Sequence, residues 1–457
     1  MDKAIKINQI IYAACFLFFG STACDTLDQE PVNTIETEGA ITSFSDAQLV
    51  LKGMYDELQS GNYYGLRYLY YQDVYADNLL HSGTFTTDQE ISSRRINPSN
   101  LQISSTWATL YKIIGTANFM LEVLPDIQNL SSSQAAAIEG EARFVRALVY
   151  FDLLKIFGGV PIVTDFVTTT SEVSLAGRAS ETEVYNFIIE DLEFAENNLG
   201  NTPNAPFRAN NWAATALLAR VHLQVGNYAL AIQKATEVIN AGYILLPNYG
   251  DISRIKGNNE MIFELNFTNN VGDQNGLAIS SDPSTSGQKF YVRPAFYNAF
   301  VASANQGDER FSTSVLEQGN NLRVIKYFRV STSDDNVPIL RLAEMYLIRA
   351  EANARRIGSG FTTGAIIDDI NIIRQRADLD PLLLTDIPTI AGALEEILEQ
   401  RRFEFAFEGH RYSDLRRYGL ADDLFPPGES FRELWPIPLQ ELELNENLVQ
   451  NNGYSSE

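Results

Sequence analysis

Residues 341–352 read RLAEMYLIRAEA, and the pattern that runs through them decides the fold. Small and aliphatic side chains recur there at steps of three and four residues: Leu340, Ala343, Leu347, Ala350 and Ala354. This spacing places them along one face of an α-helix, so the stretch predicts an amphipathic helix. Beyond the glycines at 358 and 360, four isoleucines predict a second helix that packs on the first: Ile366, Ile367, Ile370 and Ile373.

Two further helix pairs follow the same pattern. Residues 214–225 and 231–239 carry apolar faces on either side of Gly226-Asn227, and residues 394–407 and 411–418 form another pair around Gly409. In the first of these pairs, small and aromatic residues fall at the offsets of a tetratricopeptide (TPR) unit. Exact copies of about 34 residues are absent, so we expect TPR-like pairs rather than a regular array.

The rest of the chain divides into helical and irregular parts. Residues 107–124 and 134–157 predict long helices, the second nearly apolar around its later turns and therefore central. Ser45-Asp46 predicts the start of a helix towards Leu58, whereas Ser82–Ser105 reads as a long loop. In residues 242–337, an alternation at 263, 265 and 267 predicts a strand, and residues 269–288 read as loop. We therefore expect a mainly α fold, with helix pairs within 44–241 and 338–420 and an irregular half with short strands between them.

Composition excludes several classes of function. The 457 residues include 58 acidic and 34 basic side chains, which gives a net charge of −24. A nucleic-acid-binding protein needs a basic face, so that class is excluded. Two cysteines rule out a disulfide framework or a cysteine zinc site, and three histidines without an HExxH motif remove most zinc and haem chemistry. No nucleophile elbow, phosphate loop or Rossmann glycine pattern appears, so we predict no catalytic residue, metal or cofactor.

The N-terminus predicts an export signal and a lipid anchor. Lys3 and Lys6 precede an apolar segment at 7–19, which is shorter than the ~20 residues that span a bilayer. Small residues then lead to Cys24, the pattern that a lipoprotein signal peptidase requires. We predict a signal peptide at 1–23, lipidation of Cys24 and a polar tether at 24–42. No other segment approaches ~20 apolar residues, so we expect an anchored protein that does not span the membrane.

Taken together, these stretches resemble the SusD/RagB family of surface nutrient-binding lipoproteins along essentially the whole chain. The stretches that carry the resemblance are Cys24, Trp107, Tyr111, Asn118, 140–144, 157–161, 219–221, 226–228, 341–352, 401–402, 407–411, 414–417, 434–438 and 452–454.

The resemblance implies a single SusD-like domain at 43–457, with about four TPR-like pairs packed against an irregular ligand-binding half. It implies a protein anchored by lipid on the outer face of the outer membrane, which acts as a lid on a SusC-like TonB-dependent transporter. Such a protein captures oligosaccharides, or in some branches peptides or other nutrients, and passes them on without catalysis. Asp25, Asp28 and Glu30 fit export to the surface.

Several conspicuous residues are interpreted as structural. The charged side chains between Arg401 and Arg417 predict helical ion pairs, such as Glu399 with Arg402 and Asp414 with Arg417. We expect His222, His410 and the three tryptophans to pack, and the six tyrosines between 63 and 75 to lie mostly in the core. Residues 273–275 and 334–336 carry oxygen ligands that suit calcium, but solvated loops are the preferred interpretation.

Sugar binding needs an aromatic face for the ring, together with planar polar groups for its hydroxyls. Two groups of residues offer both, and the resemblance implies that ligands are held from these two general regions. The first group is Asp77, Asn78, His81, Phe85, Arg94, Arg95 and Asn97; the second is Phe267, Asn269, Phe290, Tyr291 and Arg293. The absence of loop tryptophans indicates modest affinity or a small ligand. A peptide or another nutrient remains the alternative to a glycan.

Overall fold

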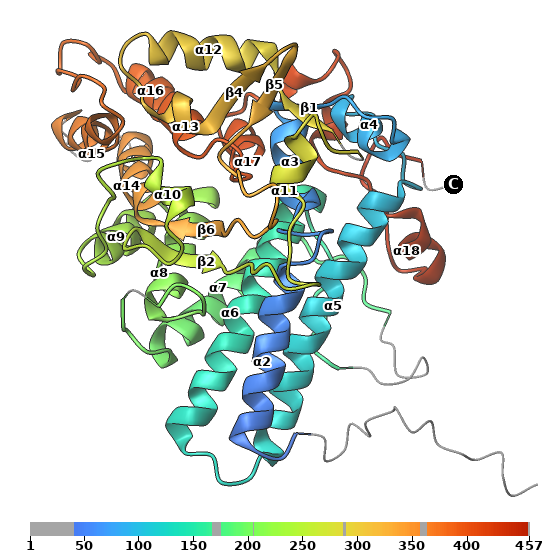
Figure 1. Ribbon diagram of the computed structural model, residues 1–457. Helices are drawn as coiled ribbons and strands as arrows, with labels where there is room; N and C mark the ends of the chain where they lie inside the picture. Colours follow the sequence, from blue (N-terminus) through green and yellow to red (C-terminus); the bar gives the residue numbers. More distant parts are fainter. Residues whose placement is uncertain (1–40, 167–174, 204, 287–288, 357–362, 456–457) are drawn as a thin grey trace, which may run out of the picture. The chain divides into compact units, whose positions relative to one another are not determined.

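The helix predicted at 341–352 is present in the computed structural model as α14 (Leu342–Arg355) (Figure 1). The structure describes residues 41–166, 175–203, 205–286, 289–356 and 363–455, so the predicted signal peptide and Cys24 lie outside it. The partner of α14 is α15 (Thr363–Arg376), as the isoleucine spacing predicts. Ala350 and Ala354 of α14 bury against Ile366 and Ile370 of α15 in one apolar cluster.

The helices that precede the irregular half of the chain (residues 242–337, here called the insertion) pack in chain order. α2, α5 and α6 lie side by side as long helices, and α6, α7, α8 and α9 each pack on the next (Figure 1). Their bounds are α2 Phe44–Leu58, α3 Arg67–Tyr75, α4 Thr86–Ser92, α5 Leu101–Val123, α6 Ser132–Phe157, α7 Glu181–Asn198, α8 Asn211–Gln224 and α9 Tyr228–Ile239, with a 3-10 turn η1 at Leu124–Asp126. The mainly helical fold and the helix pair around Gly226 are confirmed.

Side-chain caps set where these helices begin. Ser131 and Ser180 each form a capping box, with Gln134 and Glu183 respectively. The first helix is capped by Ser43 rather than by the predicted Ser45, because Ser43 reaches the backbone of Asp46. The later turns of α6 are buried on every side, as their apolar sequence predicts.

The insertion begins after α9 and ends before α14. Its elements are α10 Asp251–Arg254, β2 Met261–Leu265, α11 Leu277–Ser281, β3 Phe290–Val292, α12 Pro294–Ala304, α13 Arg310–Ser314, β4 Val315–Gln318, β5 Asn321–Val324 and β6 Val337–Arg341. β6, at the end of the insertion, runs antiparallel to β2 near its start. This pairing brings the two ends of the insertion together, and α14 packs on α9. The two helices are thus neighbours although the insertion separates them in sequence.

The insertion holds more regular structure than the sequence predicts. Short strands are confirmed, but α12 is a helix of 11 residues in a stretch interpreted as irregular. Phe296 and Phe300 form its buried face, and Phe300 stacks on Phe403 of α16 (Ile390–Glu404) with ring centroids 4.6 Å apart. The predicted strand ends at Leu265, so Phe267 lies beyond it.

The prediction that Ser82–Ser105 forms one long loop is wrong. Phe85 opens the short helix α4, and α5 already begins at Leu101, where the Asn100 side chain accepts from the backbone amides of Gln102 and Ile103. Polar residues in the first turns of α5 conceal this start, since tertiary packing of Ile103 and Trp107 outweighs weak local propensity.

The C-terminal segment returns to the first helices. Its elements are α16 Ile390–Glu404, α17 Arg411–Arg417, η2 Asp422–Leu424, η3 Ser430–Glu433 and α18 Leu439–Leu444. Trp435 is fully buried, with edge contacts to Tyr71, Tyr75 and Phe157. The predicted packing of this tryptophan and of all six tyrosines between 63 and 75 is confirmed.

A buried ionic core joins the insertion to α14, α15 and α16. Arg341, the cap residue of α14, donates to Glu260 at 3.0 Å and to Glu408 at 2.9 Å, and also contacts Glu404. We call the set the ionic core; its members are Glu260, Asp308, Arg310, Lys326, Arg341, Arg376, Glu404 and Glu408, all buried. Four cations thus face four carboxylates, and the charges balance.

The two stretches that carry calcium-type oxygen ligands are only partly solvated, since Gln274 is exposed whereas Asn275, Asp335 and Asn336 are buried. Asn275 is buried and donates to the backbone oxygen of Asp335 at 2.6 Å, while Asp335 accepts from the amide of Arg329. Within the described part of the chain, no group of three histidine, cysteine or acidic side chains is arranged to hold a metal ion. Nor does any described helix have the length and apolar character needed to cross a membrane.

Candidate functional site

The two groups of predicted ligand residues meet in a two-stranded sheet. β1 (Leu79–His81) pairs antiparallel with β3, so that Leu80 faces Tyr291 and His81 faces Phe290. The pairing continues past the strand ends, since the amide of Arg293 donates to the carbonyl of Asn78 at 2.8 Å. The pairing that joins Tyr291 to Leu80 therefore extends to Arg293 and Asn78.

The faces of this sheet differ in exposure. Phe290 and Val292 are buried, and Phe290 packs against Tyr70, Tyr71 and His81. Leu80 and Tyr291, which face each other, remain partly exposed because side chains alternate along a strand and these two point to the outer face. Arg293, just beyond the end of β3, is also partly exposed. Phe85, 45% exposed, begins α4 on the loop that follows β1. The sheet therefore offers an aromatic ring on one accessible face, with the partly exposed Arg293 just beyond the end of β3.

Asp77 lies at the start of this sheet and is held by two arginines. Arg411 donates to its carboxylate at 2.7 Å and Arg402 at 2.8 Å. Burial alone opposes the ionised form, but the hydrogen bond from Arg411 and the charges of Arg402, Arg411 and Arg94 outweigh it and lower the pKa of Asp77. The sequence-based pairing of Arg402 with Glu399 is wrong, because Arg402 turns to Asp77 and to Asn78, at 3.0 Å.

Two more arginines bind the end of α3 beside Asp77. Arg94 donates to the carbonyl of Tyr75 at 2.7 Å and to that of Ala76. Arg293 makes longer bonds to the carbonyls of Val74, at 3.4 Å, and Ser92, at 3.3 Å. Positive side chains suit this position, since the carbonyls of a helix C-terminus carry partial negative charge. Arg94 itself adopts a left-handed backbone with φ of 58°.

The other predicted residues fall into buried and exposed sets. Asn78, Phe267 and Phe290 have no exposed surface, and the His81 side chain is enclosed beside Asp88, so none of these four contacts an external ligand in this conformation. Asn97 is exposed and accepts from Ser99 within its own turn. Arg95 and Asn269 are also exposed, and Arg95 pairs with Glu429 at 3.2 Å. The predicted contacts that remain around the sheet are Asp77, Phe85, Arg94, Tyr291 and Arg293. Arg402 and Arg411, which sequence reasoning assigned to the scaffold, join them.

A polar pocket of about 490 Å³ lies apart from this sheet, at the turn after α2. Phe267 lies at its wall, and its polar lining comes from Lys52, Asp56, Gln59 and Asp273. Burial, followed by the charge of Asp273, raises the pKa of Asp56 against the influence of Lys52. The second predicted group is therefore divided: Phe267 lies here, with Asn269 in the loop that follows it, whereas Phe290, Tyr291 and Arg293 lie at the sheet.

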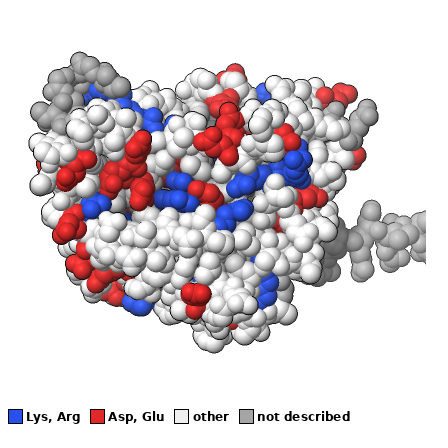
Figure 2. Space-filling model, turned by 90° about the horizontal axis from the view of Figure 1, so that it is seen from above, with Lys and Arg blue, Asp and Glu red and all other residues white. Residues whose placement is uncertain are grey.

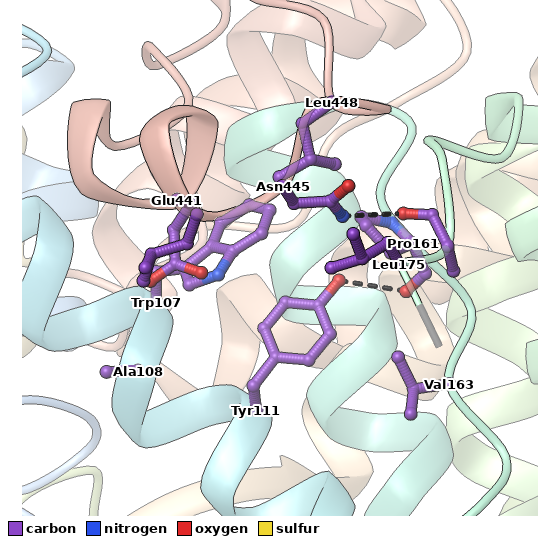
Figure 3. A pocket seen from close by; sticks show the side chains of 11 residues that line it. Trp107, Ala108, Tyr111, Pro161, Val163, Leu175, Glu441, Asn445 and Leu448 are labelled. Carbon is purple, nitrogen blue, oxygen red and sulfur yellow. Dashed lines mark hydrogen bonds between the residues drawn. The ribbon is translucent and has the colours of Figure 1, made fainter. Parts of the chain in front are cut away.

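An apolar pocket of about 320 Å³ lies between α5 and α18 (Figure 3). Trp107 and Tyr111 line it together with Leu444 and Leu448, and its polar groups are already engaged. The Tyr111 hydroxyl donates to the carbonyl of Pro161 at 2.8 Å, and Asn445 donates to that of Ala176 at 2.9 Å, the bonds drawn in Figure 3. Packing of Trp107 is confirmed by its contact with Phe157, although the sequence did not predict this pocket.

Charge on the face that carries β1, β3 and α12 is uneven. Seen from above, Lys and Arg side chains follow a band across the middle of the molecule, with Asp and Glu on both sides (Figure 2). In a chain with a net charge of −24, these basic side chains gather locally among acidic ones.

Comparisons with known proteins cover nearly the whole chain. A family model described as starch-binding and associating with the outer membrane matches residues 25–223, and the SusD family model matches residues 296–427. SusD-like protein P25 of Formosa agariphila is 26% identical over 98% of this chain and all of the relative. The starch-binding protein SusD of Bacteroides thetaiotaomicron is 24% identical over 80% of this chain and 81% of the relative.

Solved structures show the same fold. A laminarin-binding SusD-like protein superposes with a TM-score of 0.76 at 27% identity, over 90% of this chain and all of the other. Surface glycan-binding protein A from Bacteroides thetaiotaomicron gives a TM-score of 0.76 at 20% identity, over 90% of this chain and all of that one, and supports the fold alone.

Proposed function

The chain belongs to the SusD/RagB family, and from this premise we propose that it captures oligosaccharides or polysaccharides at the cell surface. The bound glycan passes to a SusC-like TonB-dependent transporter of the outer membrane for uptake, and the protein itself performs no catalysis. The single observation that carries the glycan proposal is the outer face of the β1–β3 sheet. There the ring of Tyr291 is partly exposed, and Arg293, two residues further along the chain, is also partly exposed; sugar recognition uses an aromatic face together with a planar polar group.

Relatives with known ligands support the choice of a glycan over a peptide. By their names, one protein of known structure that shares this fold binds laminarin, and one relative in sequence binds starch. A peptide ligand is the alternative, and the polar pocket beside Phe267 favours it, because amide and carboxylate side chains there suit a peptide backbone.

Affinity electrophoresis of the protein through gels that contain different polysaccharides tests this function. We expect one neutral or acidic glycan to retard the protein, and a parallel assay to detect no newly released reducing ends. Retardation together with release would replace the binding function by hydrolysis. No retardation by any glycan, with binding of a peptide library instead, would favour the alternative.

A lipid anchor at Cys24 is the second part of the proposal. Cys24→Ala is expected to release the protein from the outer membrane, since the residue that would carry the lipid is removed and the described helices include none that crosses a membrane. The measurement is protease accessibility of intact cells together with membrane fractionation. Cys15→Ala serves as the matched control and is expected to leave the protein anchored. A Cys24→Ala protein that stays membrane-bound and surface-accessible would refute the anchor.

A further inference from the structure

Four guanidinium groups converge on one carboxylate at the start of the β1–β3 sheet. Arg402 and Arg411 form ion pairs with Asp77, and the charges of Arg94 and Arg293 also act on it. We call these five residues the Asp77 cluster. Among the described residues, no carboxylate lies within ion-pair distance of Arg94 or Arg293.

Other charged groups around the cluster do not cancel its positive excess. Glu399 lies beside Arg402 on α16 but is exposed. Asp73, beneath the cluster, is fully buried, and burial raises its pKa to about 7, so it carries only part of a charge at neutral pH. The carbonyls at the end of α3 contribute roughly half a negative charge. Four cations therefore face about three negative charges, one of them on the exposed Glu399.

The ionic core shows what a balanced site looks like in the same molecule. There, carboxylates outweigh the effect of burial and raise the pKa of Arg310, Arg341 and Arg376. In the Asp77 cluster, burial lowers the pKa of both Arg293 and Arg402 to about 10, and a neighbouring arginine adds to the effect in each case. Arg178 also has a lowered pKa and caps carbonyls, so the distinguishing feature is the convergence of four arginines.

The cluster also has a donor without an acceptor, and three of its side chains are partly exposed. The Nε of Arg293 is buried without a hydrogen-bond acceptor, and the two bonds from its Nη2 are long. The side chain of Asp77 is 30% exposed, that of Arg402 17% and that of Arg411 10%. A small oxyanion can therefore reach guanidinium groups that are fixed in place, the arrangement in which arginine forms bidentate bonds.

We propose that the Asp77 cluster binds an oxyanion carried by the glycan, either the carboxylate of a uronic acid or a sulfate ester. This rests on the proposed function and specifies its ligand class as acidic. Tyr291 lies in β3 and Arg293 follows its end in extended backbone, two residues and roughly 7 Å further along the chain. A sugar ring stacked on Tyr291 thus has its substituents within reach of the cluster.

The test compares three glycan probes with the full chain purified in detergent micelles: a neutral β-glucan, a polyuronate and a sulfated galactan. The wild-type protein is expected to bind one acidic probe at least tenfold more tightly than the neutral probe. Arg293→Gln is expected to weaken binding of that acidic probe about tenfold and to weaken binding of the neutral probe clearly less, because the charge is lost while a planar hydrogen-bonding group remains. Arg254→Gln, at an exposed arginine of α10, is the matched control and should match the wild type.

A second measurement separates this inference from the proposed function. Sodium sulfate and sodium chloride at equal ionic strength are compared for their effect on Tm of the wild type, Arg293→Gln and Arg254→Gln. Sulfate also stabilises proteins by exclusion from their surfaces, and the control variant accounts for that general effect. A sulfate-specific increase in Tm that is lost only in Arg293→Gln supports the site, even if no glycan binds and the proposed function fails.

Two outcomes overturn the inference. One is equal affinity for neutral and acidic glycans without an Arg293-dependent sulfate effect, which would leave the cluster as a structural cap for α3. The other is equal loss of acidic-glycan affinity in Arg293→Gln and Arg254→Gln, which would show a general charge effect rather than a site.

Discussion

Glu404→Gln is expected to lower the free energy of unfolding by about 3–5 kcal/mol, the range for breaking a buried ion pair by removing one partner. Glu404 is the last residue of α16 and has no exposed surface. It contacts Arg341 and Arg376 directly and lies 3.6 Å from Arg310. Glutamine keeps the size of the side chain but removes the charge, so three buried arginines lose a carboxylate that cannot be replaced by water.

The pH dependence gives the same prediction a second measurement. Burial opposes ionisation of Glu404, but Arg376, Arg341 and Arg310 outweigh it and hold its pKa well below the usual value. The stabilisation by the ionised side chain is therefore complete above the unfolded pKa of about 4.3 and declines as the pH falls towards the folded pKa. The difference between wild type and Glu404→Gln should be largest near pH 7 and should shrink below about pH 4.

Urea unfolding at both pH values measures this difference. Glu395→Gln, at an exposed position on the same helix, is the matched control and should change stability by less than about 0.5 kcal/mol. A Glu404→Gln protein as stable as the control at pH 7 would mean that the arginines of the ionic core are compensated without Glu404.

Local periodicity predicted most of the helical scaffold because each apolar face in the sequence found a neighbouring helix. Residues 340–354 and 366–373 behave this way, and α14 and α15 follow from their spacing alone. Prediction failed where tertiary contacts outweigh local signals. α5 begins six residues before the predicted start at Trp107 because Asn100 caps it and Ile103 is buried, and neither effect appears as a periodic pattern.

The candidate site shows a different limit. Residue types alone predicted both groups of ligand residues, but their pairing through β1 and β3 is a long-range contact that no local pattern contains. Arg402 shows the reason most clearly. Its spacing from Glu399 suits a helical ion pair, yet it reaches Asp77, which lies 325 positions away in the chain. Charge excess at the site could be seen only after the fold had placed Arg94, Arg293 and Arg411 beside the same carboxylate.

Tyr291→Ala is expected to weaken glycan binding by roughly thirtyfold, about 2 kcal/mol, as for an aromatic anchor at the centre of a binding surface. Its ring lies on the outer face of β3 and is partly exposed, so truncation removes the stacking surface without opening a cavity in the core. Global stability should therefore change little. Phe85→Ala, which removes the exposed ring at the start of α4, should weaken binding in the same assay if the ligand extends along β1.

The control for this variant is Tyr297→Ala on α12, where the ring is also partly exposed but the hydroxyl donates to Glu317 at 3.0 Å, away from β1. Affinity electrophoresis on the glycan that retards the wild type measures all three variants. Tyr291→Phe distinguishes the two roles of the side chain. Retained affinity in Tyr291→Phe means that the ring face carries the binding, whereas a loss equal to that of Tyr291→Ala means that the hydroxyl does. Unchanged affinity in Tyr291→Ala would place the glycan elsewhere, with the polar pocket beside Phe267 as the next surface to test.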